Sequence, residues 1–203
     1  IFFLKKKTKP RQLVRNAIRD TVRTLRGDTR FRRIAVVAAL ANTSLVLFPH
    51  YQPVAADILK MPVGNIMIWV IAQNIGLAIF SLILGPLADF KGNRAVLRIL
   101  LLGLTLTPVL TMVLTIGPWG ARYYWMVFVL VGLTPVTIGI LQNYALELTL
   151  PEHQPRYLAT LSICSAIPII FSPIASYSMD VFNSPYPLFT GVTLLLATAW
   201  LRQ

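Results

Sequence analysis

Apolar runs as long as a lipid bilayer is thick dominate this sequence, and they limit the folds open to it. The clearest run covers residues 65–87. A helix needs about 20 consecutive apolar residues to span the hydrocarbon core of a membrane. Composition agrees, because 56% of the residues are hydrophobic and only 13% are charged, whereas a soluble domain carries about 25% charged residues. The chain is therefore predicted to be an integral membrane protein.

The runs and the turns between them predict an all-α fold, a bundle of six transmembrane helices within residues 34–203. Residues 1–33 are predicted to form a separate basic, cytoplasmic segment. The sixth run is shorter than the roughly 20 residues that a bilayer needs, and the chain begins with Ile1 rather than Met. Both features favour a fragment of a longer protein. The expected spans are residues 34–51, 65–87, 95–116, 123–145, 158–179 and 186–201.

Positive charge is concentrated before the first span. The formal net charge is +12, and most of the Lys and Arg residues precede residue 34. Within residues 11–26, apolar residues recur at steps of three and four, and Arg15, Arg19 and Arg23 form a stripe beside them. This pattern predicts a basic amphipathic helix on an anionic cytoplasmic leaflet. Nucleic-acid binding is the alternative, which the direct continuation into a membrane span disfavours.

The distribution of Lys and Arg also predicts the orientation of the bundle. The basic segment, the turn after the second span, Arg156 and Arg202 would lie on one side, and only Lys60 and Arg122 on the other. In membrane proteins the cytoplasmic loops carry the excess of Lys and Arg. Both ends of the chain are therefore expected in the cytoplasm, and the protein in the plasma (inner) membrane.

A charged, glycine-punctuated decapeptide, residues 85–94, joins the second and third apolar runs. Gly85 lacks a side chain and would let two helices approach closely. A carboxylate at Asp89, at the end of an apolar run, is costly unless it faces water or a partner. Gly92 can take the positive φ that a tight turn requires. These residues predict a tight turn between two membrane helices, and a plain positive-inside loop with a capping Asp is the simplest interpretation.

This decapeptide resembles the signature loop of the major facilitator superfamily, G-x-L-A-D-x-x-G-x-R, which joins the second and third helices of each six-helix half. The basic residues that members often carry at the positions of Phe90 and Asn93 are absent. The matching residues are Gly85, Leu87, Ala88, Asp89, Gly92 and Arg94.

A second, looser resemblance lies between the fourth and fifth runs. Glu147, Pro151 and Arg156 are similar to the E-x-x-P-x-x-x-R pattern of the same superfamily, with a slightly longer spacing. An interfacial loop with ordinary charges is the alternative there.

The resemblance implies one six-helix half, the C-terminal one, of a twelve-helix secondary active transporter that moves a small solute by alternating access. Its partner would be the missing N-terminal half, and residues 1–33 would contain the linker between the halves. One alternative is an N-terminal half with a long basic tail. Another is a non-transporting membrane scaffold or sensor with the same fold.

For the turn, the resemblance implies a cytoplasmic gate. Asp89 is expected to pair with Arg94 and to face the start of the fifth span near Leu158, because the positive end of a helix dipole favours a nearby carboxylate. The residues assigned to the gate are Gly85, Asp89, Gly92, Arg94, Glu147 and Arg156.

In the superfamily, the first, second, fourth and fifth helices of a half face the central cavity. Amide side chains in the middle of these runs are the candidates for contact with the solute, because an unpaired polar group in an apolar medium costs several kcal/mol. Hydrogen bonding between helices is the alternative. The candidates are Asn42, Gln73, Asn74, Gln142 and Asn143.

Other chemistry finds little support. No charged residue lies in the middle of a predicted span, His50 and His153 would stand at opposite interfaces, and Cys164 is the only cysteine. No metal site, catalytic constellation or cofactor site is therefore predicted, which disfavours a membrane-embedded enzyme. The sequence predicts a transporter rather than an enzyme.

Overall fold

The computed structural model describes residues 10–203, with side chains described from residue 18 onward apart from position 63. Residues 1–9 of the predicted basic segment lie outside the described part. Within residues 10–203 every regular element is a helix. The all-α fold is therefore confirmed, and five helical stretches are long and apolar enough to cross a membrane. They are Thr29–Asp57, Ile66–Lys91, Asn93–Ile116, Trp125–Glu147 and Pro151–Phe182.

The first span is a chain of short helices rather than one rod. It is interrupted after Ala41 and again at the turn that contains Pro49. The amide Nδ2 of Asn42 donates to Ala38 O at 2.9 Å, so the side chain uses a helical carbonyl, and Pro49 has no N–H to give to a preceding turn. The elements are α2 (Thr29–Ala41), α3 (Thr43–Leu47), η1 (Phe48–His50) and α4 (Tyr51–Asp57).

A one-residue turn joins the second and third spans. After the short η2 (Val63–Asn65), α5 covers Ile66–Lys91 and α6 covers Asn93–Ile116. Gly92 stands between the two helices at φ 82° and ψ 150°, and its N–H donates to Ala88 O at 2.8 Å. Residues with a Cβ rarely adopt this conformation, so the positive φ expected at Gly92 is confirmed.

The fourth and fifth spans are broken where proline follows. Pro135 has no N–H for the last turn of the helix that ends at Val131, and Pro173 has none for the helix that ends at Ile170. The elements are α7 (Gly120–Tyr123), α8 (Trp125–Val131), α9 (Leu133–Glu147), η3 (Pro151–His153), α10 (Gln154–Ile170) and α11 (Ser172–Phe182).

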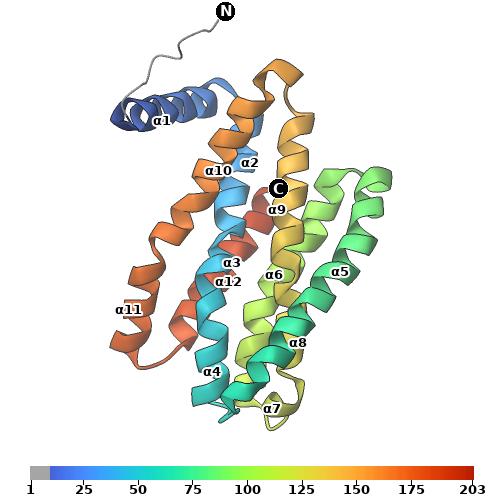
Figure 1. The fold of residues 1–203 in the computed structure, drawn as a ribbon, viewed down its shortest axis with the longest axis vertical. Helices are drawn as coiled ribbons and strands as arrows, with labels where there is room; N and C mark the ends of the chain where they lie inside the picture. The colour runs from blue at the N-terminus through green and yellow to red at the C-terminus, as the bar shows by residue number, and fades with distance from the viewer. Residues whose placement is uncertain (1–9) are drawn as a thin grey trace, which may run out of the picture.

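The last helix, α12, covers Tyr186–Arg202 and has 17 residues. At 1.5 Å per residue it is about 26 Å long, shorter than each of the five stretches above. It packs along α6 and α2 (Figure 1). The number of six transmembrane helices therefore stays a prediction, although six predicted runs all form helices.

Packing between the spans follows a repeated pattern. α5 packs on α8 as α10 packs on α2, and α6 packs on α9 as α12 packs on α2, while α6 and α12 pack on each other. These pairs are exchanged for one another when the first three predicted spans are exchanged with the last three, whereas the packing of α10 on α9 has no counterpart between α5 and the first span. Because two spans lie between the members of each exchanged pair, corresponding spans run in opposite directions through the bundle.

Two glycines bring α5 close to the fourth span. A Cβ on Gly132 would lie 2.6 Å from Leu77 N and 2.7 Å from Gln73 O, and a Cβ on Gly76 would meet the backbone of Val129. Small residues allow this backbone approach between membrane helices. Gly85 differs, because a Cβ there would meet no atom within 4 Å. The close approach expected at Gly85 is therefore absent from the described chain.

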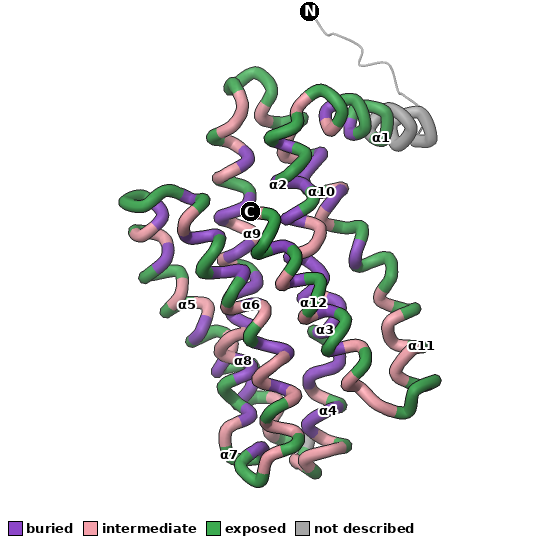
Figure 2. Tube along the Cα trace, turned by 180° about the vertical axis from the view of Figure 1, so that it is seen from behind, coloured by how far each residue is buried: buried purple, intermediate pink, exposed green. Residues whose placement is uncertain are grey.

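Burial differs strongly between the spans (Figure 2). In the most apolar window of the first span 61% of residues are buried inside the protein, against 17% for α5 and 22% for the stretch Pro151–Phe182. α5 and α10–α11 correspond to each other in the repeated packing pattern, and they lie on opposite sides of the bundle in Figures 1 and 2. Each leaves an apolar face uncovered by the rest of the chain.

The N-terminal helix α1 (Pro10–Gly27) lies across one end of the bundle, at a steep angle to the spans (Figure 1). Asp28 connects it to the bundle. Oδ1 of Asp28 accepts hydrogen bonds from the N–H groups of Arg30 and Phe31 and so caps α2, while Oδ2 accepts the hydroxyl of Tyr157 at 3.1 Å. The ring of Tyr157 also packs on Phe31, with centroids 4.4 Å apart. The connection therefore ties α1, α2 and α10 together.

Candidate functional site

A small, mainly apolar cavity with a few polar side chains lies between the first, fourth and fifth spans. Its volume is about 210 Å³. No charged side chain lines it, so its polar groups are amides and hydroxyls, which bind neutral or weakly polar groups through hydrogen bonds. The lining residues are Asn42, Ile138, Leu141, Gln142, Leu161, Ser162, Ser165, Ala166 and Ile169.

Amides of the first and fourth spans contribute to this cavity. Asn42 is the residue between α2 and α3, is 4% exposed, and uses one hydrogen of its amide on Ala38 O. An amide has a second N–H and a carbonyl oxygen, so bonding capacity remains on the Asn42 side chain. Gln142 on α9 is exposed at the opposite wall. The cavity thus presents amides from two spans to a common space.

The structure separates the five amides predicted from the sequence. Asn42 and Gln142 share the cavity, whereas Gln73, Asn74 and Asn143 do not line it. Asn74 is exposed on α5, and its Nδ2 donates to Val70 O of its own helix at 2.8 Å. The Asn74 amide is therefore hydrogen-bonded within its own helix.

Two hydroxyls in the cavity were missed by the sequence analysis. Ser162 and Ser165 lie three residues apart on α10, a spacing that sets both on one face of a helix. The sequence signal for these cavity residues was the pair of serines in a mainly apolar run.

A set of hydrogen bonds joins the spans at the end of the bundle where α2 begins. Nδ2 of Asn93 donates to Oε1 of Glu147 at 2.7 Å, which links α6 to the end of α9. Nη2 of Arg94 donates to Gln203 O at 2.8 Å, and Nε2 of Gln203 donates back to Arg94 O at 2.9 Å. We call this end of the bundle, with α2, the turn at Gly92 and the last turn of α12, the basic end.

The gate expected within this chain is not formed. Asp89 is exposed, and the guanidinium of Arg94 bonds to Gln203 instead of Asp89. α5 and α10 lie on opposite sides of the bundle (Figures 1 and 2): both pack on α9, but α5 packs further on α8 and α6, and α10 on α2 and α1. Asp89 therefore does not face the start of the fifth span near Leu158, and this part of the prediction is wrong.

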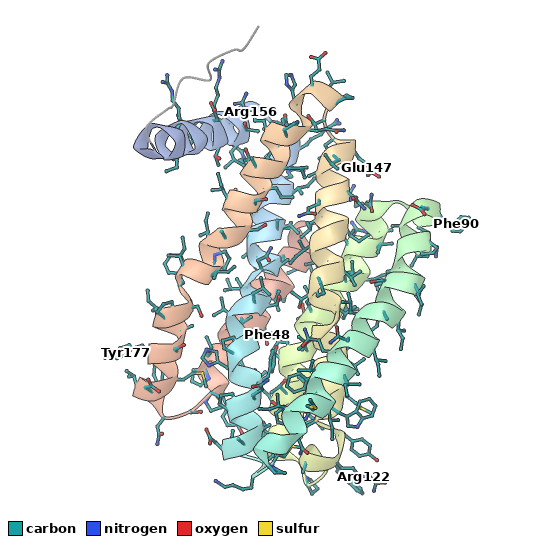
Figure 3. The ribbon with its side chains drawn as sticks, viewed as in Figure 1. Phe48, Phe90, Arg122, Glu147, Arg156 and Tyr177 are labelled. Atoms are coloured by element: carbon teal, nitrogen blue, oxygen red, sulfur yellow. The ribbon has the colours of Figure 1, made fainter. Side chains whose placement is uncertain are left out.

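Glu147 and Arg156 also belong to separate networks. Both lie at the basic end, on α9 and α10 respectively (Figure 3). Glu147 accepts from Asn93, whereas Nη2 of Arg156 donates to Asp20 O in α1 at 3.2 Å. The two residues of the second resemblance therefore link different neighbours: one secures the turn at Gly92, and the other secures α1.

Among residues 10–203 no group of three or more His, Cys, Asp or Glu side chains could hold a metal ion. Comparisons of the chain with known protein families, with curated proteins and with solved structures find no match. The function has to be argued from the geometry and the chemistry of the chain itself.

Proposed function

We propose that this chain is one six-helix half of a secondary active transporter of the major facilitator type, which moves a small polar solute by alternating access. The repeated packing of the spans supports this proposal. Each half of such transporters is built from two three-helix repeats of inverted topology. The exchange of the first three spans with the last three, with directions reversed, is the arrangement that such repeats produce.

The observation that carries the proposal is the uncharged, mainly apolar cavity that holds the amides of Asn42 and Gln142. Transporters of this kind bind their solute near the bilayer midplane, next to interrupted helices. The cavity lies beside the break between α2 and α3, and hydroxyls of the fifth span complete it. Because amides, hydroxyls and a larger apolar surface line it without any charge, the solute is a small molecule with apolar surface and neutral hydrogen-bonding groups.

The exposed apolar faces of α5 and α11 support a second six-helix half as the partner of this chain. α5 carries Leu82 at 76% exposure, and α11 carries Ile174 at 63% exposure. The open space at Gly85 and the exposed Asp89 lie on α5 as well. We infer that Asp89 meets its gate partner on that second half rather than on the fifth span of this chain.

The basic helix α1 is assigned to the cytoplasmic leaflet. Ile18 and Val22, four residues apart on α1, are 55% and 42% exposed, so the protein leaves an apolar face uncovered, while Arg19 and Arg23 are exposed beside it. A helix of this type lies in the headgroup region of anionic membranes. This assignment puts the basic end, and both ends of the described chain, on the cytoplasmic side.

Uptake by the intact protein tests the cavity. Asn42→Ala and Gln142→Ala should each raise the KM for the transported solute about tenfold, because each removes a hydrogen bond to it. Asn74→Ala and Asn143→Ala are matched controls that delete an amide outside the cavity, and they should leave KM unchanged. Equal effects in all four variants, or none in any, would contradict the proposed solute site.

Accessibility distinguishes the transporter from a scaffold of the same fold. In a Cys164→Ser background, Ser165→Cys should react with a small hydrophilic thiosulfonate, because a transported polar solute must reach this cavity through water. Ile79→Cys, an exposed apolar position on α5, should not react. An unreactive Ser165→Cys would favour a scaffold with a sealed cavity.

A further inference from the structure

Four arginines from three different helices surround one pocket at the basic end. The pocket has a volume of about 390 Å³ and is lined by Arg30 and Arg33 of α2, Arg94 of α6 and Arg202 of α12. None of its lining residues is an Asp or Glu. Arginine is the side chain best suited to bind a phosphate, because its planar fork donates two parallel hydrogen bonds.

The nearby carboxylates are already engaged. Asp28 caps α2 through Oδ1 and accepts the hydroxyl of Tyr157 through Oδ2. Glu147 accepts a hydrogen bond from Asn93 at 2.7 Å. The pocket therefore gathers like charges with no acidic side chain in its lining. The positive-inside rule explains an excess of cations on one side of the membrane. It does not explain why four arginines line a single pocket.

The floor of this pocket is apolar. Ile34, Val37 and Leu97 line it and are 7%, 2% and 0% exposed. Tyr144 and Leu148 also line the pocket and are half-buried. Guanidinium groups beside this apolar surface fit a ligand with a charged head and a hydrocarbon portion.

A second pocket connects this site to the surface of the bundle. It has a volume of about 330 Å³ and is lined by Arg32, Arg33, Val36 and Arg202. Arg33 and Arg202 thus line both pockets. Val36 is 37% exposed, so this second pocket opens beside apolar surface between α2 and α12. A headgroup at Arg33 and Arg202 would leave its acyl chains next to the exposed Val36.

We propose that the arginine pocket binds a phosphate group, supplied by an anionic phospholipid of the cytoplasmic leaflet. Basic pockets between membrane helices on this side bind such headgroups. The site is separate from the surface contact of α1, since no residue of α1 lines either pocket. It joins the first, third and sixth spans through one ligand and does not depend on transport activity.

Lipid titration of the purified, delipidated intact protein tests this proposal. Binding is followed by native mass spectrometry with dioleoylphosphatidylglycerol, and with dioleoylphosphatidylcholine as the zwitterionic lipid of the same chains. The double variant R33Q/R202Q should weaken binding of the anionic lipid about 10- to 30-fold, from about 1 kcal/mol per removed cation. It should leave phosphatidylcholine binding unchanged.

K91Q/R98Q is the matched control. Lys91 and Arg98 are exposed cations at the same end of the bundle that line neither pocket, so this variant loses the same net charge and should keep the lipid affinity. Equal weakening in both double variants would overturn the site and leave a diffuse surface effect. Lipid affinity unchanged in R33Q/R202Q would overturn it as well.

A parallel titration with inorganic phosphate identifies the source of the phosphate group. Millimolar phosphate is compared with the lipids by its protection against thermal unfolding. If this protection is lost in R33Q/R202Q but kept in K91Q/R98Q, the phosphate site is supported. If phosphatidylglycerol also binds no better than phosphatidylcholine, the natural ligand is a soluble anion. Selective binding of phosphatidylglycerol, without protection by phosphate, supports the lipid.

Discussion

At the scale of single residues, α5 and the fourth span pack closely because Gly76 and Gly132 have no Cβ. Gly132→Ala would bring a Cβ within 2.6 Å of Leu77 N, a backbone atom of a packed helix. Backbone atoms cannot turn away as a flexible side chain can, so the helices must separate. We expect a loss of about 1–3 kcal/mol in the free energy of unfolding, measured as a lower Tm in detergent.

Gly139 provides the control for this substitution. It lies on α9, the helix that begins directly after Gly132, and a Cβ there would meet no atom within 4 Å. Gly139→Ala should keep or raise the Tm, since Ala favours a helix by up to about 1 kcal/mol over Gly. Equal Tm values for the two variants would show that the two helices do not meet at Gly132.

At the scale of helices, Asp28 is the point where α1 is attached. Asp28→Ala removes the cap of α2, which is worth about 1 kcal/mol, and also removes the acceptor for Tyr157. We expect α1 to detach more often from α10, so that trypsin cleaves after Arg23 and Arg26 several-fold faster while the bundle stays intact.

Asp57→Ala, at the exposed end of α4, is the control for that experiment. It deletes a carboxylate at the opposite end of the bundle and should leave the cleavage rate unchanged. Tyr157→Phe should show an intermediate rate, because it removes the bond to Oδ2 but keeps the cap. A cleavage rate in Asp28→Ala equal to that of the unsubstituted protein would contradict the attachment.

Helices themselves were predictable from the sequence, but the faces they present were not. The apolar runs predicted helices at all six positions, and the observed helices extend further because a helix can continue past the apolar run. Which of Gln73, Asn74, Gln142 and Asn143 faces the cavity could not be read, because lipid and protein interior are equally apolar. Hydrophobic periodicity therefore does not fix the rotation of a membrane helix.

The partners of the charged turn were equally hard to predict. The tight turn at Gly92 follows from local chemistry, since a positive φ favours glycine. The contacts of Arg94 with Gln203 and of Asn93 with Glu147 join residues far apart in the sequence. They depend on which helices pack together, and the assumption that α5 meets α10 gave Asp89 the wrong neighbour.

At the scale of the whole molecule, the charge distribution fixes an expected orientation. Arg122 lies at the end opposite Glu147 and Arg156 (Figure 3). In a background of Cys164→Ser, which removes a buried cysteine, Lys60→Cys should react with an impermeant maleimide in intact cells. Lys91→Cys should react only after permeabilisation, because the basic end faces the cytoplasm. The reverse pattern would invert the bundle and contradict the proposed cytoplasmic α1.

In the intact protein, a second six-helix half is expected to cover the apolar faces of α5 and α11. A photoactivatable side chain at Leu82 or Ile174, which are 76% and 63% exposed, should form a covalent adduct with a second six-helix half. The same group at Val113 on α6 is 59% exposed, and we expect it to capture lipid alone, since the third span faces away from the cavity in the proposed arrangement. The adducts are separated by mass after cleavage between the halves. If Leu82 and Ile174 gave only lipid adducts, as Val113 should, these faces would lie in the bilayer, and the chain would not be half of a larger transporter.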